Sequence, residues 1–255
     1  MALIKATVKQ MLNVMNEIAP PELCEEWDNP GLLIGCADAY VTAIMLCVDA
    51  TESVIREARE CGAQLIISHH PLMFHAIKHV RDDEPEGHVI CELIRNNMSL
   101  IAAHTNLDAA HGGVNDALVE TLGLTCVSAP EPFLRVGSMN GTLDGIAQFV
   151  RDKLDTRVMT YGPGDAHIER VALCSGAGGS EIRAAKEYGA QLFITGEMKH
   201  NELIEARQMG LSVICAGHFE TERVVLSHLA GGLQTRFSAL QYKANIFISK
   251  SHPLA

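Results

Sequence analysis

An internal repeat is the feature that most constrains how this chain can fold. The segment SVIREARECGAQLIIS, residues 53–68, aligns without gaps on SEIRAAKEYGAQLFIT, residues 180–195, and ten of the sixteen positions are identical. Repetition of this kind predicts that each copy builds the same supersecondary unit. We therefore expect two related halves, residues 1–128 and 129–255, that arose by duplication and remain closely associated.

Each copy of the repeat has the pattern of a strand, a helix and a second strand. An apolar run precedes it, apolar residues then recur at helical spacing, and a glycine, Gly62 or Gly189, ends the helix. A further helix-like stretch and a third apolar run, MSLIAAH or LSVICAGH, follow in each half. This alternation predicts an α/β fold made of two β-α-β halves, with mostly parallel sheets and helices packed on them.

The composition is that of an ordinary globular protein and argues against several functional classes. No run reaches the roughly 18 apolar residues of a membrane span, so we expect no membrane partner. The formal net charge of -11 argues against nucleic acid as the main partner, because binding phosphates needs a basic surface. The eight cysteines include no C-x-x-C pair and several lie in apolar runs, which favours a reducing, cytoplasmic location.

Histidines and carboxylates follow the predicted strands. Two adjacent histidines end the run LIIS, and a histidine with a carboxylate four residues later follows the third strand of each half: His69, His70, His104, Asp108, His218 and Glu222. The carboxyl ends of parallel strands are where α/β proteins bind ligands. Imidazole and carboxylate together suit zinc, iron or manganese. We expect a transition-metal site in the cleft between the halves.

The adjacent histidines favour two ions over one. Neighbouring residues on an extended segment point to opposite sides, and Pro71 keeps His70 extended, so we expect one ion for each ring. Other interpretations remain open for the carboxylates, since Asp108 could be a helix N-cap and Glu222 a first-turn acid. The segment SGAGGS, residues 175–180, is typical of a tight strand-to-helix turn and, more weakly, of a phosphate cradle.

Five motifs, in this order, resemble the NIF-three-like dinuclear metal-centre family, also known as the type two GTP cyclohydrolase I family: WDNPGLLIG (27–35), SHHPLMF (68–74), HTNLD (104–108), TGE (195–197) and GHFETE (217–222). The resemblance implies two related α/β domains, a dinuclear centre in the cleft between them and a toroidal homohexamer. It implies five metal ligands, with Glu222 bridging the ions: His69, His70, Asp108, His218 and Glu222.

Two further residues receive catalytic roles. The resemblance implies that His104 lies near the centre without being a ligand, although the repeat makes it the counterpart of His218, and we expect it to orient a ligand or the substrate. Glu197 stands where His70 stands in the repeat. It is predicted to be a base or hydrogen-bond acceptor in the cleft, or else a helix-start acid. The family pattern departs at His200 and Asn201, and we assign no role there.

These residues predict a dinuclear metal-dependent hydrolase in which an activated bridging water attacks a nucleotide or a related small substrate. A GTP cyclohydrolase-like reaction is what the family resemblance implies. The alternative is a non-catalytic metal-binding or metal-chaperone hexamer that engages a protein partner. A structural oligomer whose histidines satisfy one another is the third hypothesis.

Overall fold

The computed structural model describes residues 4–254, and the chain divides into two compact units. The first unit comprises the residues up to 110 together with those from 226 onward, and the second comprises residues 111–225. This division differs from the predicted halves, 1–128 and 129–255. The C-terminal segment returns to the first unit because β13 (Asn245–Ile248) pairs in parallel with β4 (Ala43–Cys47).

The first unit is built on a five-stranded sheet of order β13-β4-β5-β6-β2. Its other strands are β5 (Leu65–Ser68), β6 (Ser99–Ala102) and β2 (Gly31–Ile34). Every neighbouring pair is parallel except β2 with β6. A small antiparallel pair, β1 (Ala6–Thr7) with β3 (Tyr40–Val41), lies apart from this sheet. The predicted parallel character therefore describes the main sheet of this unit.

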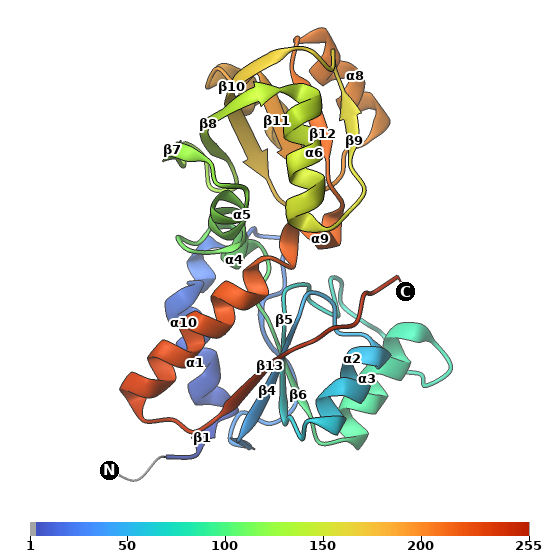
Figure 1. The fold of residues 1–255 in the computed structure, drawn as a ribbon. Helices are drawn as coiled ribbons and strands as arrows, with labels where there is room; N and C mark the ends of the chain where they lie inside the picture. Colours follow the sequence, from blue (N-terminus) through green and yellow to red (C-terminus); the bar gives the residue numbers. More distant parts are fainter. Residues whose placement is uncertain (1–3, 255) are drawn as a thin grey trace. The chain divides into compact units, whose positions relative to one another are not determined.

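Helices cover both faces of this sheet (Figure 1). On one face, α2 (Glu52–Glu60) and α3 (Pro85–Arg95) share a buried apolar cluster with Met45, Ile66 and Leu100 of the strands. On the other lie α1 (Val8–Ile18) and α10 (Val225–Leu240). The helix α1 starts at Val8, because Thr7 and Gln10 form a capping box there. The short elements η1 (Pro21–Leu23) and α4 (Thr105–Ala109) complete the unit.

The second unit has a six-stranded sheet of order β7-β8-β10-β11-β12-β9. The strands are β7 (Thr125–Ser128), β8 (Arg135–Thr142), β9 (Met159–Tyr161), β10 (His167–Cys174), β11 (Leu192–Thr195) and β12 (Ser212–Cys215). Only β10, β11 and β12 pair in parallel. The other pairings are antiparallel, so the prediction of a mostly parallel sheet is wrong for this unit. The short β7–β8 connection cannot make the crossover that a parallel pair requires.

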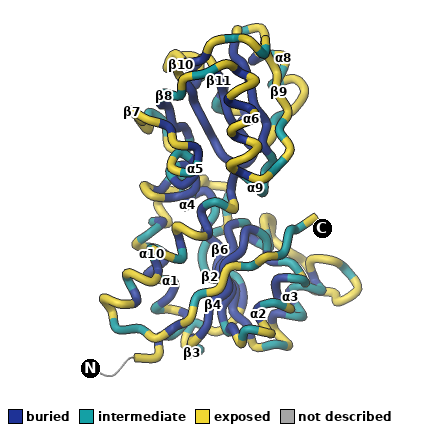
Figure 2. The backbone as a smooth tube through the Cα atoms, viewed as in Figure 1, coloured by how far each residue is buried: buried dark blue, intermediate teal, exposed yellow. Residues whose placement is uncertain are grey.

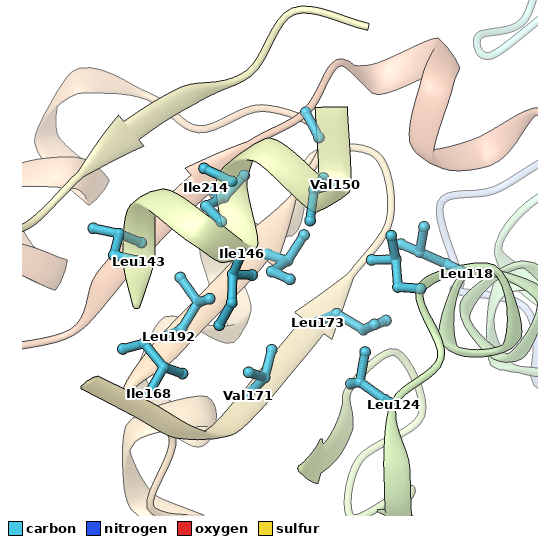
Figure 3. Close-up of a cluster of buried hydrophobic side chains, with 14 of the residues drawn as sticks. Leu118, Leu124, Leu143, Ile146, Val150, Ile168, Val171, Leu173, Leu192 and Ile214 are labelled. Carbon is cyan, nitrogen blue, oxygen red and sulfur yellow. The ribbon is translucent and has the colours of Figure 1, made fainter. Parts of the chain in front are cut away.

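Alternating side chains of the central strands pack into two cores, one on each face of the sheet of the second unit. Val171 and Leu173 of β10 face the cluster beneath α5 (Val114–Leu122) and α6 (Leu143–Leu154), which Figure 3 shows. Ala172 and Cys174 face the opposite cluster, beneath α7 (Ile182–Glu187) and α8 (His200–Gln208). The strands are accordingly buried along most of their length (Figure 2). Two short elements, η2 (Gly178–Glu181) and α9 (His218–Glu222), lie beside the sheet's carboxyl edge.

Together with the strands that precede them, the repeated segments form β4-α2-β5 in the first unit and β10-η2-α7-β11 in the second, so the second copy differs by one short 3-10 turn. Both strand pairs are parallel, with Ile44 opposite Leu65 and Val171 opposite Leu192. A shared mixed α/β architecture is thus observed, while its origin by duplication stays a prediction. Among residues 4–254, no helix is both long enough and apolar enough to cross a membrane.

Candidate metal centre

The first candidate ligands are His69 and His70, which come directly after β5. The four residues of β5 are buried between β4 and β6. Pairing continues past the strand, because the His69 amide donates to the Cys47 carbonyl (3.0 Å) and the His70 amide to the Val48 carbonyl (2.9 Å). The backbone of both histidines is therefore held at the carboxyl edge of the sheet, where parallel strands present their ligand sites.

The two rings converge rather than diverge. Their centroids are 5.0 Å apart and their planes are tilted by 41°. The prediction that they point to opposite sides is wrong, because both residues lie in a bend beyond the end of β5, where strand alternation does not apply. His69, His70 and His104 each offer a ligand atom, and these atoms lie within 4.8 Å of one another. Alternation along the strand therefore gives no support for one ion per ring.

Asp108 joins this group through α4. His104 is the N-cap residue of that helix and Asp108 is its fourth residue, so Asp108 is not the helix cap. Its Oδ1 lies 3.5 Å from His69 Nε2. The first unit thus brings together all four site residues that the sequence predicted within it.

The Nδ1 atoms of His69 and His70 each lie within hydrogen-bonding distance of an oxygen. The Nδ1–H of His69 donates to the Ala103 carbonyl (2.9 Å), which can only accept, and Nδ1 of His70 lies 2.8 Å from Asp49 Oδ1. An imidazole that donates its Nδ1–H in this way presents the Nε2 lone pair to a metal, and such oxygens commonly orient metal-binding histidines. The donor set of the first unit therefore fits a transition metal.

Asp28 plays the same part for His104. Its Oδ1 lies 2.9 Å from His104 Nδ1, and its other oxygen accepts from the Thr105 backbone amide (3.0 Å) and hydroxyl. Burial alone would raise the pKa of the Asp28 carboxyl, but the hydrogen bonds from His104 and Thr105 outweigh it and lower the pKa from 3.8 to about 2. Asp28 thus remains ionised and fixes both the His104 ring and the start of α4.

The second unit carries its own group. His218 and Glu222 are the first and last residues of α9, and His218 Nε2 lies 3.0 Å from the buried Oε1 of Glu222. On the other side of the ring, Nδ1 lies 3.0 Å from Glu197 Oε1. One imidazole between two carboxylates is satisfied either as an imidazolium or by a cation at Nε2. Glu197, which comes just after β11, orients this ring as the first unit's aspartates orient theirs.

The glycine-rich segment after β10 packs against this pair. Gly176 has a φ of +58°, and a Cβ there would collide with Glu222 Oε1 and lie 3.2 Å from His218 Nε2. The Gly176 amide donates to Thr221 Oγ1 (3.0 Å), and its carbonyl accepts from the Glu197 amide (2.9 Å). The segment is a strand-to-helix turn in which the lack of a side chain at Gly176 leaves space for the Glu222 carboxylate.

Sequence reasoning missed two of the residues that orient the rings. Asp49 is the penultimate residue of the run VTAIMLCVDA, and Asp28 lies inside the motif WDNPGLLIG. An acid directly after a buried strand was the available signal for Asp49. Asp28 precedes its partner by a long stretch of chain and gave no local signal. His200 and Asn201 are exposed and begin α8.

Comparison with known proteins decides the family. A family model described as Duf34/NIF3 (NGG1p interacting factor 3) matches residues 6–254. The chain belongs to the Duf34/NIF3 family. The predicted resemblance is thereby confirmed.

Relatives and solved structures of the Duf34/NIF3 family match over nearly their whole length. The GTP cyclohydrolase 1 type 2 homolog of Clostridium perfringens is 34% identical, covering 91% of this chain and 93% of that protein. NGG1-interacting factor 3 of Saccharomyces cerevisiae is 29% identical, covering 91% and 92% respectively. The crystal structure of a Bacillus cereus protein related to NIF3 superposes with a TM-score of 0.93 at 23% identity over 98% of both chains, which shows the fold.

Proposed function

We propose that this Duf34/NIF3 protein is a metal-dependent hydrolase whose ions are bound by side chains of both units: His69, His70, Asp108, His218 and Glu222. The observation that carries the proposal is the engagement of the three Nδ1 atoms by oxygens, which leaves Nε2 as the donor of each histidine. Three imidazoles and two carboxylates exceed the needs of one tetrahedral ion. They suit two ions, with Glu222 as the bridge.

The proposed chemistry divides between the ions and the chain. Divalent zinc, iron or manganese at such a site supplies the acidity that activates water and polarises a substrate oxygen. Glu197 is the proposed base, since its carboxylate is largely exposed and already hydrogen-bonded to His218. His104, locked by Asp28, is proposed to orient a ligand or the substrate.

The proposed substrate is a nucleotide or a related small molecule. The name of the Clostridium perfringens relative, a GTP cyclohydrolase 1 type 2 homolog, supports this class. We also propose the homohexamer that the family resemblance implies, which sedimentation velocity would test directly.

The test of hydrolysis compares metal-loaded and chelator-stripped protein on a panel of nucleotides and phosphoesters. We expect turnover only with metal, and its loss in His69→Ala. His88→Ala is the matched control, because His88 is an exposed histidine paired with Asp82. Loaded and stripped protein that are equally inert on the whole panel would refute the hydrolase. If the inert protein also exchanged its metal within minutes, a metal-chaperone role would be favoured instead.

A further inference from the structure

The single tryptophan of this chain lies in an unusual environment. The sequence is poor in aromatic residues, at 5%, and contains one Trp. Trp27 is nevertheless 59% exposed, and Phe74 is 41% exposed. Tryptophan is highly buried on average, so leaving this ring in water sacrifices a large hydrophobic gain.

Both exposed rings pack against the same histidine. The ring centroids of Trp27 and His104 are 5.8 Å apart at 72°, and those of Phe74 and His104 are 5.5 Å apart at 85°. Phe74 also lies 6.5 Å from the ring of His70. These contacts are edge-to-face or tilted, so neither aromatic ring is stacked on an imidazole. We call Trp27 and Phe74 the aromatic rim.

The aromatic rim is held in place by the residues beside it. Asp28, next to Trp27, binds His104 and Thr105, and its side chain is fully buried. Asn29 Nδ2 donates to the carbonyl of Met73, next to Phe74, at 2.7 Å. The two segments that carry the rings are therefore tied to each other and to the start of α4. Such preorganisation lowers the entropy lost when a ligand binds.

The charged residues beside Trp27 disfavour phosphate binding at that ring, whereas Lys78 follows Phe74 in the other segment of the rim. Glu25 and Glu26 precede Trp27 and are exposed, and no lysine or arginine lies between Glu22 and Gly35. Carboxylates repel phosphate, but they accept hydrogen bonds from ring N–H and amino groups. The Trp27 side of the rim thus suits the ring of a ligand rather than its anionic part.

We propose that the aromatic rim binds a planar nitrogen heterocycle of the nucleobase type by stacking. This proposal rests on the proposed function in one respect, namely that the bound heterocycle is part of the substrate. Stacking on an aromatic side chain is worth about 1–3 kcal/mol per base, and it tolerates different bases because each has a π face. The rim would hold the ring beside His70 and His104, while any phosphate would be left to the proposed metal ions.

The single tryptophan reports on this contact directly. Titration of chelator-stripped protein with guanosine, with Trp27 excited selectively, should give saturable quenching, and ribose alone should give none. Because neither the phosphate nor the metal takes part, the result does not depend on hydrolysis. Phe74→Leu should weaken guanosine binding about 30-fold, which corresponds to the middle of the stacking range. Phe74→Tyr should restore it.

Matched controls separate stacking from loss of structure. Tyr40→Leu removes another exposed aromatic ring of the same unit and should leave the titration unchanged. Trp27→Leu removes the fluorescent reporter, so its guanosine binding is measured by calorimetry. This variant should lose guanosine binding yet keep its bound metal. Absence of quenching by guanosine, equal quenching by ribose, or an unaffected Phe74→Leu would each overturn the proposal, even if the metal-loaded protein proved to be a hydrolase. The proposal would also be overturned if guanosine left the Trp27 emission unchanged while dissociation of the protein on dilution shifted that emission to the red. The rim would then form contacts between copies of the chain.

Discussion

The histidines of the candidate centre differ in the oxygen that holds each ring. For His69 it is a main-chain carbonyl, whereas for His70, His104 and His218 it is a carboxylate. A carboxylate makes the imidazole a stronger donor, and it can be removed by mutation without touching the ring. The contribution of orientation to metal affinity is therefore measurable at single residues.

Asp49→Ala tests this contribution at His70. The substitution leaves all five proposed ligands in place but frees the His70 ring to rotate, so we expect metal affinity to fall about 10- to 100-fold. Competition with a chromophoric chelator measures it. Asp38→Ala, which removes an exposed aspartate of the same unit, is the control and should bind metal normally. Equal affinity in both variants would show that His70 needs no anchor.

The lowered pKa of Asp28 predicts how the stability of the protein depends on pH. Its folded-state pKa is depressed from 3.8 to about 2, so its contribution to stability is present above about pH 4 and is lost as the pH falls towards 2. Because its side chain is buried, the shift corresponds to about 2 kcal/mol. Asp28→Asn should lower the free energy of unfolding by about that amount at pH 6, and by much less near pH 2. Urea titrations of metal-free protein across this range test it, and parallel curves for the two proteins would contradict it.

At the scale of elements, the turn after β10 sets the position of the second unit's carboxylate. Gly176→Ala would introduce a Cβ against Glu222 Oε1 at a positive φ. The backbone strain alone costs about 1–2 kcal/mol. The carboxylate must also move, so we expect metal affinity to fall by about tenfold or more, a loss comparable to that of an orienting residue. Thermal unfolding and metal titration measure the two effects separately.

Gly231 provides the opposite case on α10. A Cβ at this position meets no atom within 4 Å and needs no positive φ. Alanine loses less backbone entropy than glycine when a helix forms, so Gly231→Ala should stabilise the protein by about 0.5–1 kcal/mol and leave metal affinity unchanged. A destabilised Gly231→Ala protein would show that alanine substitution as such, rather than the site of Gly176, explains the loss.

Elements with strong local patterns were predictable, and those defined by distant partners were not. The run LIIS, the helical spacing around Val54 and Ile55, and the glycine at 62 correspond to β5, α2 and the end of α2. By contrast, β13 is half-exposed, and its place beside β4 depends on pairing with residues near the start of the chain. The bend at His69 and His70 was also missed, since periodicity describes a strand but not the chain beyond its last residue.

For the whole molecule, the predicted ligands divide between two units, each of which has buried apolar clusters of its own. The apolar cluster of β4, α2 and α3 belongs to the first unit, and the clusters on either face of β10 belong to the second. In our proposal, ions bound by both units couple their stabilities.

This leads to a prediction for metal-linked unfolding. A ligand that binds only the folded state stabilises it by RT ln(1 + [L]/Kd), about 2.7 kcal/mol at a hundredfold excess over Kd. If both units bind the same ions, metal should raise the stability of both. Calorimetry of stripped protein should then show a broader or divided transition, which zinc sharpens and moves upward. His218→Ala changes only the second unit, yet it should also abolish the stabilisation of the first unit by zinc. Hydrogen exchange of the backbone amides of β4 and β5 measures that stabilisation. If zinc still protected β4 and β5 in His218→Ala, the first unit would bind its metal alone and the shared centre would be refuted.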